Sequence, residues 1–308
     1  MTAEKDKKTR GLSRGERLKR DYKYFFYVLP VLVGVALFTL LPMIVSLVYS
    51  FSDYDFTKAE NQITQFTLRN YRRMFTDKAL GYSLFITFRY SIVTVVLSMA
   101  GSYALALFLN QKLKVIPALR VIYYLPNLIP AIAGTLLWKN ILDTDTGYLN
   151  LIFSGLGLPK YTFYDLKETV FPTILFTSLF GWGGGTIMWL AQMKNIPAEM
   201  YEAADLDGAN YFHKLWYITI PMTTSMIFYI LITSIISSLQ VFGGFYALRN
   251  GINDSEINFI VLKIYIDGFE GFDLSYACAL SWLLFVIIGV LTTFIFKTSK
   301  WVYYGEEA

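Results

Sequence analysis

The residues that could carry chemistry gather in one polar stretch, EMYEAADLDGANYFHKLWYITIP, at positions 199–221. It holds four acidic residues, one lysine and His213, the only histidine of the chain, between two long apolar segments. The chain contains no HExxH, GxSxG or GxGD motif, which argues against an intramembrane hydrolase. We therefore expect His213 to be solvated or to lie at an interface.

The local pattern of this stretch predicts a helix, a tight turn and a second helix. Asn195 is expected to cap the first helix, with Pro197 in its first turn where a missing N–H costs little. Gly208 is the natural left-handed stop of that helix. Asn210 is expected to cap a second helix that leads into the next apolar segment.

The first of these helices has a face suited to contact with another protein. Ala203 and Ala204 make the face nearly flat, and Met200 and Tyr201 flank it as plausible anchors. A helix that only lay in the membrane interface would more often carry large apolar residues on that face. The pattern therefore predicts that the helix lies in a groove of a partner.

Composition places the chain in a membrane. Of 308 residues, 55% are hydrophobic and only 16% are charged, which is too apolar for one soluble domain of this length. A helix needs about 20 residues to cross the hydrocarbon core. Windows without Asp, Glu, Lys or Arg span 24–52, 90–111, 121–138, 169–193, 215–248 and 274–296. The sequence thus predicts an all-α integral membrane protein with six transmembrane helices.

Charge distribution predicts the orientation and the divisions of the chain. We expect a basic tail at 1–23, a six-helix domain at 24–297 with a cytoplasmic loop at 195–221 between spans four and five, and a tail at 298–308. The tail to Lys23, the loops at 110–120 and 194–221 and the C-terminus from Lys297 hold 16 of the 27 lysines and arginines. The positive-inside bias therefore places both termini in the cytoplasm. The basic tail is expected to anchor this orientation and not to bind nucleic acid.

Several spans carry features that a simple anchor would not need. Two prolines in YYLPNLIPA should kink span three and free carbonyls near Asn127. The segment GWGGG permits close helix approach or a local break around Trp182. In span five, Ser237 and Gln240 lie on a polar stripe, which should face protein or water. The alternatives are that these polar groups bond helix to helix or to their own helix, and that Trp182 is ordinary packing.

The polar stretch resembles a known motif. It resembles the EAA loop of ABC importer permeases, which is written EAA-x3-G-x9-I-x-L-P. The matching positions here are Glu202, Ala203, Ala204, Gly208, Ile218 and Pro221, and Ile220 stands in place of the leucine. LRNYRRMF at 68–75 and GYLNLIFSGLGLP at 147–159 are similar to the carbohydrate-uptake branch, the MalF/UgpA-like permeases. The resemblance extends from about residue 25 to residue 297.

This resemblance implies a coupling helix that docks on a separate ATPase. The residues expected to dock it are Met200, Tyr201, Glu202, Ala203, Ala204, Asp207 and Gly208. The chain has no GxxxxGK[ST] phosphate loop, so ATP and Mg are expected on the partner ATPase, and no cofactor or metal is expected in this chain. The implied partners are two ATPase subunits, a second and different permease subunit, and an extracellular or periplasmic solute-binding protein, all at a bacterial plasma membrane.

The same resemblance implies that the cargo is a sugar or an oligosaccharide. A sugar pathway should combine aromatic rings with uncharged hydrogen-bonding groups, and the residues expected there are Asn127, Trp182, Ser237 and Gln240. A permease for a glycerol-phosphate ester is the alternative cargo, but a phosphate favours a cavity-facing cation, and the spans offer only Arg89. A channel or scaffold subunit would explain six helices but not the spacing of the EAA residues.

Overall fold

The computed structural model describes residues 14–54, 65–111, 113–251 and 253–302. Most of the basic tail and residues 303–308 of the predicted C-terminal tail lie outside these residues. Within them the fold is helical, and the only β-pairing is an isolated bridge between Ser52 and Phe66. The helices are α2 (Arg14–Val35), α3 (Leu41–Ser50), α4 (Arg69–Met74), α5 (Lys78–Leu109), α6 (Ile116–Tyr124), α7 (Ala131–Ile141), α8 (Tyr148–Gly155), α9 (Lys167–Ser178), α10 (Gly183–Lys194), α11 (Ala198–Leu206), α12 (Tyr211–Lys214), α13 (Ile220–Met222), α14 (Thr224–Leu239), α15 (Gly243–Leu248), α16 (Asp254–Ile257), α17 (Ile260–Tyr265) and α18 (Leu274–Lys297).

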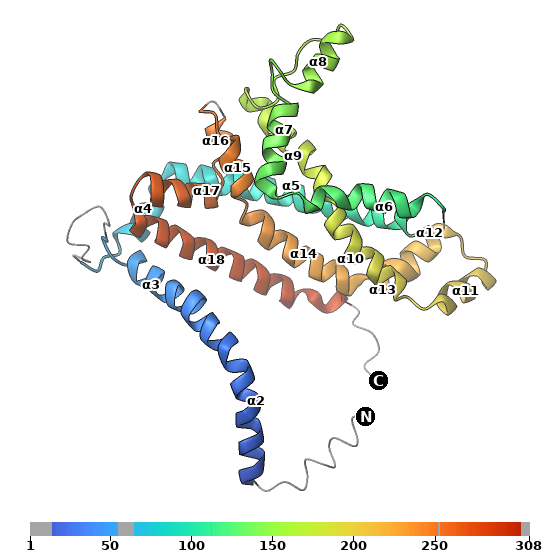
Figure 1. Ribbon diagram of the computed structural model, residues 1–308, viewed down its shortest axis with the longest axis horizontal. Coiled ribbons are helices and arrows are strands. Elements are labelled where there is room, and N and C mark those ends of the chain that lie inside the picture. Colours follow the sequence, from blue (N-terminus) through green and yellow to red (C-terminus); the bar gives the residue numbers. More distant parts are fainter. Residues whose placement is uncertain (1–13, 55–64, 112, 252, 303–308) are drawn as a thin grey trace.

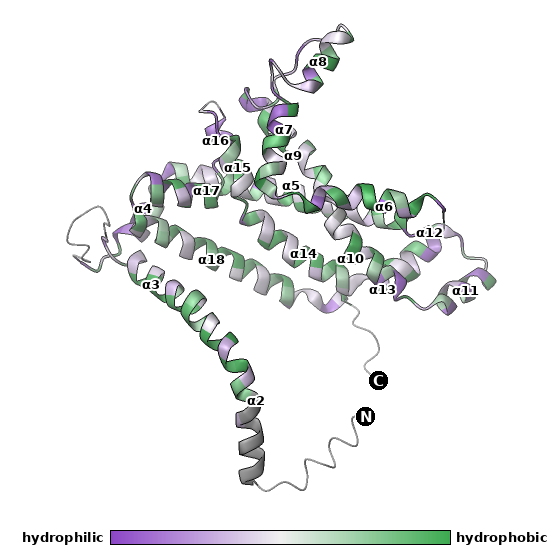
Figure 2. Cartoon of the chain, in the orientation of Figure 1, coloured by the Kyte–Doolittle hydropathy of each residue, from purple (hydrophilic) through white to green (hydrophobic). Residues whose placement is uncertain are grey.

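Four helical segments of the described chain are long and apolar enough to cross a membrane. They are Phe25–Ser50, Lys78–Leu109, Thr224–Leu248 and Leu274–Lys297. Two further pairs, α6 with α7 and α9 with α10, meet the same criteria only if each bent pair is one span. The integral-membrane, all-helical prediction is thus confirmed, and six spans follow if both bent pairs cross. In Figure 2 the cartoon is coloured mainly as hydrophobic along these helices and as hydrophilic around α4, α11 and α12.

The long helices form an elongated bundle with two distinct ends. The central helix α5 packs against α10 and α14, and α18 packs against α3. In Figure 1, α4 and α17 lie at one end of the bundle, and α11 and α12 lie at the other. Helix α2 points away from the bundle, and none of the apolar window of this first span is buried.

Span two begins earlier than its apolar window. Arg89 therefore lies inside α5, and its guanidinium carbon is 3.8 Å from the centre of the Phe171 ring.

Span three is kinked, as its two prolines predict. Helix α6 ends at Tyr124, a 3-10 turn follows, and Pro130 precedes the first residue of α7. The two helices meet at 101°. Because proline cannot donate a backbone hydrogen bond, the helix cannot continue through this point. At this break the side-chain amide of Asn127 donates to the Tyr123 carbonyl at 3.3 Å.

Span four shows both a local bend and a close helix approach, the two outcomes that its glycines allow. Helices α9 and α10 meet at 43° around the glycine-rich segment. The ring of Trp182 lies directly against Gly101 of α5, where an added Cβ would be 2.1 Å from the nearest ring carbon. An added Cβ on Gly185 would likewise lie 3.2 Å from the Ser102 hydroxyl. The missing side chains therefore let α5 and span four approach closely.

A buried ionic cluster joins several helices at the α4 end. Asp77 caps α5 and accepts a hydrogen bond from the Tyr276 hydroxyl at 2.8 Å. Lys263, whose side chain is only 8% exposed, lies 3.2 Å from Asp77 and 3.0 Å from Asp267. Burial opposes the charge of Asp77, but hydrogen bonds from Tyr276, the Leu80 N–H and Lys263 hold its pKa below the usual value. These contacts fix the start of α5 against α17 and α18.

Candidate functional site

The predicted docking helix is present as α11, with one difference at its start. Asn195 does not cap α11; it terminates α10, and Pro197 is the residue that precedes the first turn. The extended backbone of Pro197, at φ −58° and ψ 133°, turns the chain into α11 without a side-chain cap. The prediction placed the cap two residues too early because a proline with extended backbone can itself occupy the cap position.

The predicted turn after α11 is confirmed. Gly208 has φ +76°, the left-handed conformation that favours glycine. The Ala209 N–H donates to the Ala204 carbonyl at 2.9 Å, and the Gly208 N–H donates to the Asp205 carbonyl at 3.1 Å. This pair of hydrogen bonds is a Schellman motif, which satisfies carbonyls at the end of a helix. Gly208 thereby fixes the orientation of α11 relative to the segment that follows it.

The second helix of the stretch begins as expected and continues into span five. The Asn210 side chain accepts the His213 N–H at 2.9 Å and so caps α12. A π-helical turn follows at Leu215–Thr219 and leads into α13. Pro221 lies two residues beyond this turn and cannot donate to the preceding turn, which accounts for the widened backbone. A continuous path therefore joins α11 to α14.

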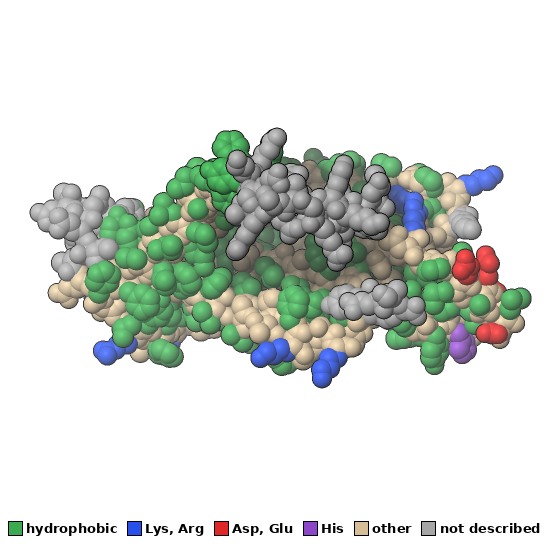
Figure 3. All heavy atoms as spheres, turned by 90° about the horizontal axis from the view of Figure 1, so that it is seen from below, with side chains coloured by type: hydrophobic (Ala, Val, Ile, Leu, Met, Phe, Trp, Pro, Cys, Tyr) green, Lys and Arg blue, Asp and Glu red, His purple; other side chains and the backbone are tan. Residues whose placement is uncertain are grey.

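Most of the predicted docking residues face outward. Met200, Glu202, Ala203, Asp207 and Gly208 are exposed, and Ala204 is half-buried. In the described part of the chain, no side-chain hydrogen bond or ion pair engages Glu202 or Asp207. Figure 3 shows acidic side chains and the histidine together at the α11 and α12 end of the molecule. The face is free to contact another protein.

Two residues of α11 differ from what the sequence suggests. Leu206 has 91% of its surface exposed, but it is not among the predicted docking residues. The sequence feature that could have indicated it is an apolar residue between two acidic residues and close to a glycine turn, a place far from the core of the bundle. Tyr201, predicted as a docking anchor, is half-buried, and its hydroxyl lies 3.0 Å from Thr219 Oγ1 of the same chain. It thus also contacts the base of its own loop.

A cavity of about 450 Å³ lies where the bent spans three and four meet the break between α14 and α15. Its lining is aromatic and hydroxylic, and no charged side chain of the described residues contributes to it. The aromatic residues are Tyr90, Trp138, Tyr164, Phe180, Phe242 and Phe245, and the hydroxyl-bearing ones include Thr135, Thr177 and Ser178. The Trp138 and Phe180 rings lie 4.6 Å apart. The proline kink of span three and the bend of span four open this space.

None of the four predicted pathway residues is among the residues that line the cavity, although three of them have a chain neighbour that does. Asn127 is exposed at the kink of span three, and Ser237 and Gln240 are exposed at the end of α14. Trp182 packs on Gly101, and its indole N–H is buried without an acceptor among the described residues. Their chain neighbours Pro126, Gly181 and Val241 do line the cavity. The roles of the four residues stay predictions.

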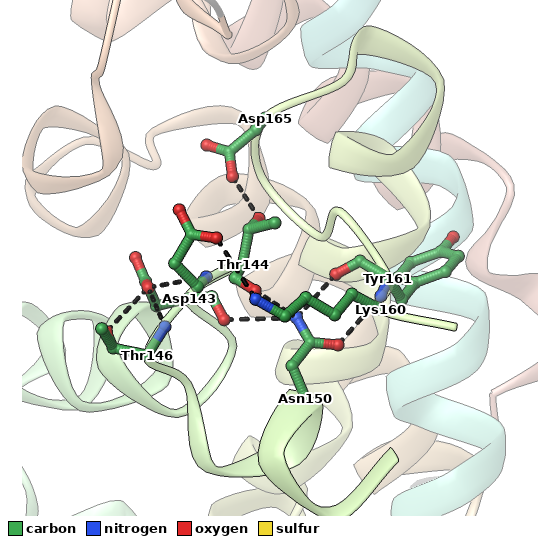
Figure 4. Close-up of polar contacts among 8 residues, drawn as sticks. Asp143, Thr144, Thr146, Asn150, Lys160, Tyr161 and Asp165 are labelled. Atoms are coloured by element: carbon green, nitrogen blue, oxygen red, sulfur yellow. Dashed lines mark hydrogen bonds and ion pairs between the residues drawn. The ribbon is translucent and has the colours of Figure 1, made fainter. Parts of the chain in front are cut away.

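The connection between α7 and α9 supports one wall of the cavity. Residues 146–159 contain the short helix α8. The buried Asn150 side chain donates to the carbonyls of Asp143, Thr144 and Tyr161 and accepts the Tyr161 N–H at 2.9 Å (Figure 4). The Thr146 N–H and hydroxyl lower the pKa of Asp143 by hydrogen bonding. This network fixes the segment that leads to Tyr164.

Comparison with known proteins gives consistent results. The model of a family described as "Binding-protein-dependent transport system inner membrane component" matches residues 98–302. The probable ABC transporter permease protein YesP of Bacillus subtilis (strain 168) is 32% identical over 289 residues, 92% of each chain. The trehalose/maltose transport system permease protein MalF of Thermococcus litoralis is 29% identical, over 90% of this chain and 93% of its own.

Solved structures share the fold. A bacterial alginate ABC transporter, crystallised in complex with an alginate pentasaccharide-bound periplasmic protein, contains a chain with a TM-score of 0.84 and 23% identity. The match covers 92% of this chain and 96% of that one. The similarity therefore extends over nearly the whole molecule and includes the bent spans.

Proposed function

This chain belongs to the family of binding-protein-dependent transport system inner membrane components, and from this premise we propose that it moves a sugar or an oligosaccharide into the cell. As a permease subunit of an ABC importer, it is a transport component and not an enzyme. Its cargo would be delivered by an external solute-binding protein. The energy would come from ATP and Mg on a pair of separate ATPase subunits.

The observation that carries the docking part of this proposal is the outward face of α11. Its alanines leave the helix surface flat, and the exposed Glu202 and Asp207 have no hydrogen-bond or ion-pair partner in the described chain. The Schellman turn at Gly208 holds the helix at the tip of the bundle. We infer that this end is cytoplasmic and that closure of the ATPase pair moves α11 as a lever. The attached spans would then alternate between inward-open and outward-open states.

The aromatic cavity supports a sugar as the cargo. Sugars present apolar ring faces, which stack on aromatic side chains, and hydroxyls, which need uncharged hydrogen-bonding partners. The lining supplies both, and among the described residues it includes no Arg or Lys that a phosphate ester would favour. Similar proteins named for trehalose, maltose and arabinooligosaccharide transport support the same cargo class. A second, different permease subunit would complete the pathway.

Replacing Trp138 with alanine tests the cavity. We expect uptake at low sugar concentration to fall at least about tenfold, which is the effect of losing an aromatic contact of roughly 1.4 kcal/mol. The assay measures uptake of radiolabelled neutral and uronic-acid oligosaccharides and of glycerol 3-phosphate by vesicles that contain the complete importer and its binding protein. Trp282→Ala is the control, because Trp282 is also half-buried but lies in α18, outside the cavity.

Two results would contradict the proposal. Uptake of glycerol 3-phosphate but of no oligosaccharide would replace the cargo class. Equal losses in the Trp138→Ala and Trp282→Ala variants would show that the cavity has no specific part in the pathway. Co-purification of the ATPase with each variant shows that the importer still assembles.

A further inference from the structure

Two tyrosine and two threonine hydroxyls, linked through the backbone carbonyl of Thr219, form a hydrogen-bond chain from the docking helix into the core of the bundle. The Tyr201 hydroxyl of α11 lies 3.0 Å from Thr219 Oγ1, at the end of the π-helical turn. Thr223 Oγ1 donates to the Thr219 carbonyl at 2.9 Å. The Tyr103 hydroxyl of α5 lies 3.1 Å from Thr223 Oγ1. The chain therefore joins three elements that are far apart in the sequence.

The threonine hydroxyls also have carbonyl acceptors within reach. Thr219 Oγ1 lies 3.2 Å from the Lys214 carbonyl, and Thr223 Oγ1 lies 2.9 Å and 3.0 Å from the carbonyls of Thr219 and Ile220. Each threonine hydroxyl has one proton to donate. When that proton is donated to a carbonyl, the hydroxyl accepts from its tyrosine, and Tyr201 and Tyr103 are the donors.

Burial protects this hydrogen-bond chain from exchange with water. Thr223 is fully buried, and Thr219 is 7% exposed, so water cannot readily replace a broken bond at either residue. The Tyr103 ring is held at 4.9 Å from the buried Trp189 of α10, in an edge-to-face contact. The inner end of the chain is thus anchored where α5 and α10 pack together. The outer end is on the helix that the ATPase would move.

Few other polar contacts attach α11 to the rest of the described chain. Besides Tyr201, only Asp205 makes a side-chain contact with another element, an ion pair with Lys214. The Asp205 side chain is 64% exposed, so solvent screens this pair. The Tyr201 hydroxyl bond is the part-buried one of the two, and it ends at the π-helical turn that leads into span five.

We propose that Tyr201 is a positioning residue that transmits the movement of α11 through Thr219 and Thr223 to Tyr103 of α5. This inference rests on the proposed function, because it needs an ATPase that moves α11. It gives Tyr201 a different role from that of a docking anchor. Met200, Glu202 and Leu206 would bind the motor, and Tyr201 would connect the bound helix to the spans.

Tyr201→Phe and Tyr103→Phe test the chain, because each removes one hydroxyl and keeps the ring. Each variant is assembled as the complete importer in proteoliposomes with its binding protein. We expect the sugar transported per ATP hydrolysed to fall about fivefold in either variant, the size expected from one hydrogen bond. The midpoint of thermal unfolding should fall only slightly, because one hydrogen bond is lost, and the amount of co-purified ATPase should stay unchanged. In the Tyr201→Phe, Tyr103→Phe double variant, the sugar transported per ATP should fall no further than in the more impaired single variant, because both substitutions break the same hydrogen-bond chain.

Tyr217→Phe is the matched control. Tyr217 lies in the same loop, is 77% exposed, and its hydroxyl bonds no other described residue, so the transport ratio should not change. An unchanged ratio in both Tyr201→Phe and Tyr103→Phe would overturn the linkage while leaving the proposed function intact. Loss of the ATPase from Tyr201→Phe would overturn it in favour of direct docking. Failure of the unsubstituted chain to hold an ATPase would instead reject the proposed function itself.

Discussion

Replacing Gly101 with alanine should destabilise the importer, although alanine is the better helix former. Trp182 occupies the space of the missing side chain, and an added Cβ would lie 2.1–2.4 Å from three of its ring carbons. Either the ring must leave its place or α5 and span four must separate. Overpacking of this kind costs about 1–3 kcal/mol, which should exceed the helix-propensity gain of up to about 1 kcal/mol.

Gly81→Ala provides the matched control in the same helix. An added Cβ at Gly81 has no neighbour within 4 Å, so only the gain in helix propensity applies there. The midpoint of thermal unfolding of the purified importer in detergent should fall for Gly101→Ala and should stay constant or rise for Gly81→Ala. A Gly101→Ala variant as stable as Gly81→Ala would show that the close approach of α5 to Trp182 is absent.

Replacing Gly208 with valine should uncouple transport from ATP hydrolysis. Valine at φ +76° carries the strain of the left-handed region, about 1–2 kcal/mol. Relief of that strain would unwind the Schellman turn and change the direction of α11. We expect transport to fall about tenfold or more, since about 1.4 kcal/mol of strain corresponds to a factor of ten. Asparagine tolerates this backbone conformation, so Gly208→Asn should retain more activity.

Gly157→Val separates uncoupling from the general cost of strain. Gly157 ends α8 at φ +73°, and the Leu158 and Gly157 N–H groups repeat the same hydrogen-bond pattern to Phe153 and Ser154. Both glycines also have open space around them. The two valine variants should therefore lose similar stability, measured by thermal unfolding, while only Gly208→Val loses transport per ATP. Equal transport losses in both would refute a special role for the Gly208 turn.

Features set by local chemistry were predictable from the sequence. The kink of span three, the stop at Gly208 and the cap at Asn210 each follow from one residue and its immediate neighbours, and the structure confirms them. The membrane class follows from apolar windows, which need no tertiary information. The start of α5 was misplaced because charges end an apolar window but do not end a helix: Lys78 and Arg89 both lie within it.

Features set by tertiary contacts were not predictable in the same way. Helical spacing placed Gln240 on a polar stripe, but α14 ends at Leu239 and the helix resumes only at Gly243, so its neighbour Val241 lines the cavity instead. The inward turn of Tyr201 depends on Thr219, which lies 18 residues away along the chain. No periodicity of α11 alone could reveal that contact. The packing of Trp182 on Gly101 likewise needs the register of two helices.

The docking of an ATPase on α11 is tested most directly by site-directed cross-linking. Leu206 and Phe75 are both apolar and both 91% exposed. Leu206 is the last residue of α11 and Phe75 directly follows α4, and these two helices lie at opposite ends of the molecule (Figure 1). In a Cys278→Ser background, which removes the only native thiol, Leu206→Cys and Phe75→Cys are each treated with a short thiol-to-amine cross-linker in membranes that contain the complete importer. Mass spectrometry then identifies the captured protein. We expect Leu206→Cys to capture the ATPase subunit and Phe75→Cys not to capture it. Two results would contradict docking on α11: an ATPase cross-linked only to position 75, or an ATPase cross-linked to neither position in an importer that still hydrolyses ATP and transports.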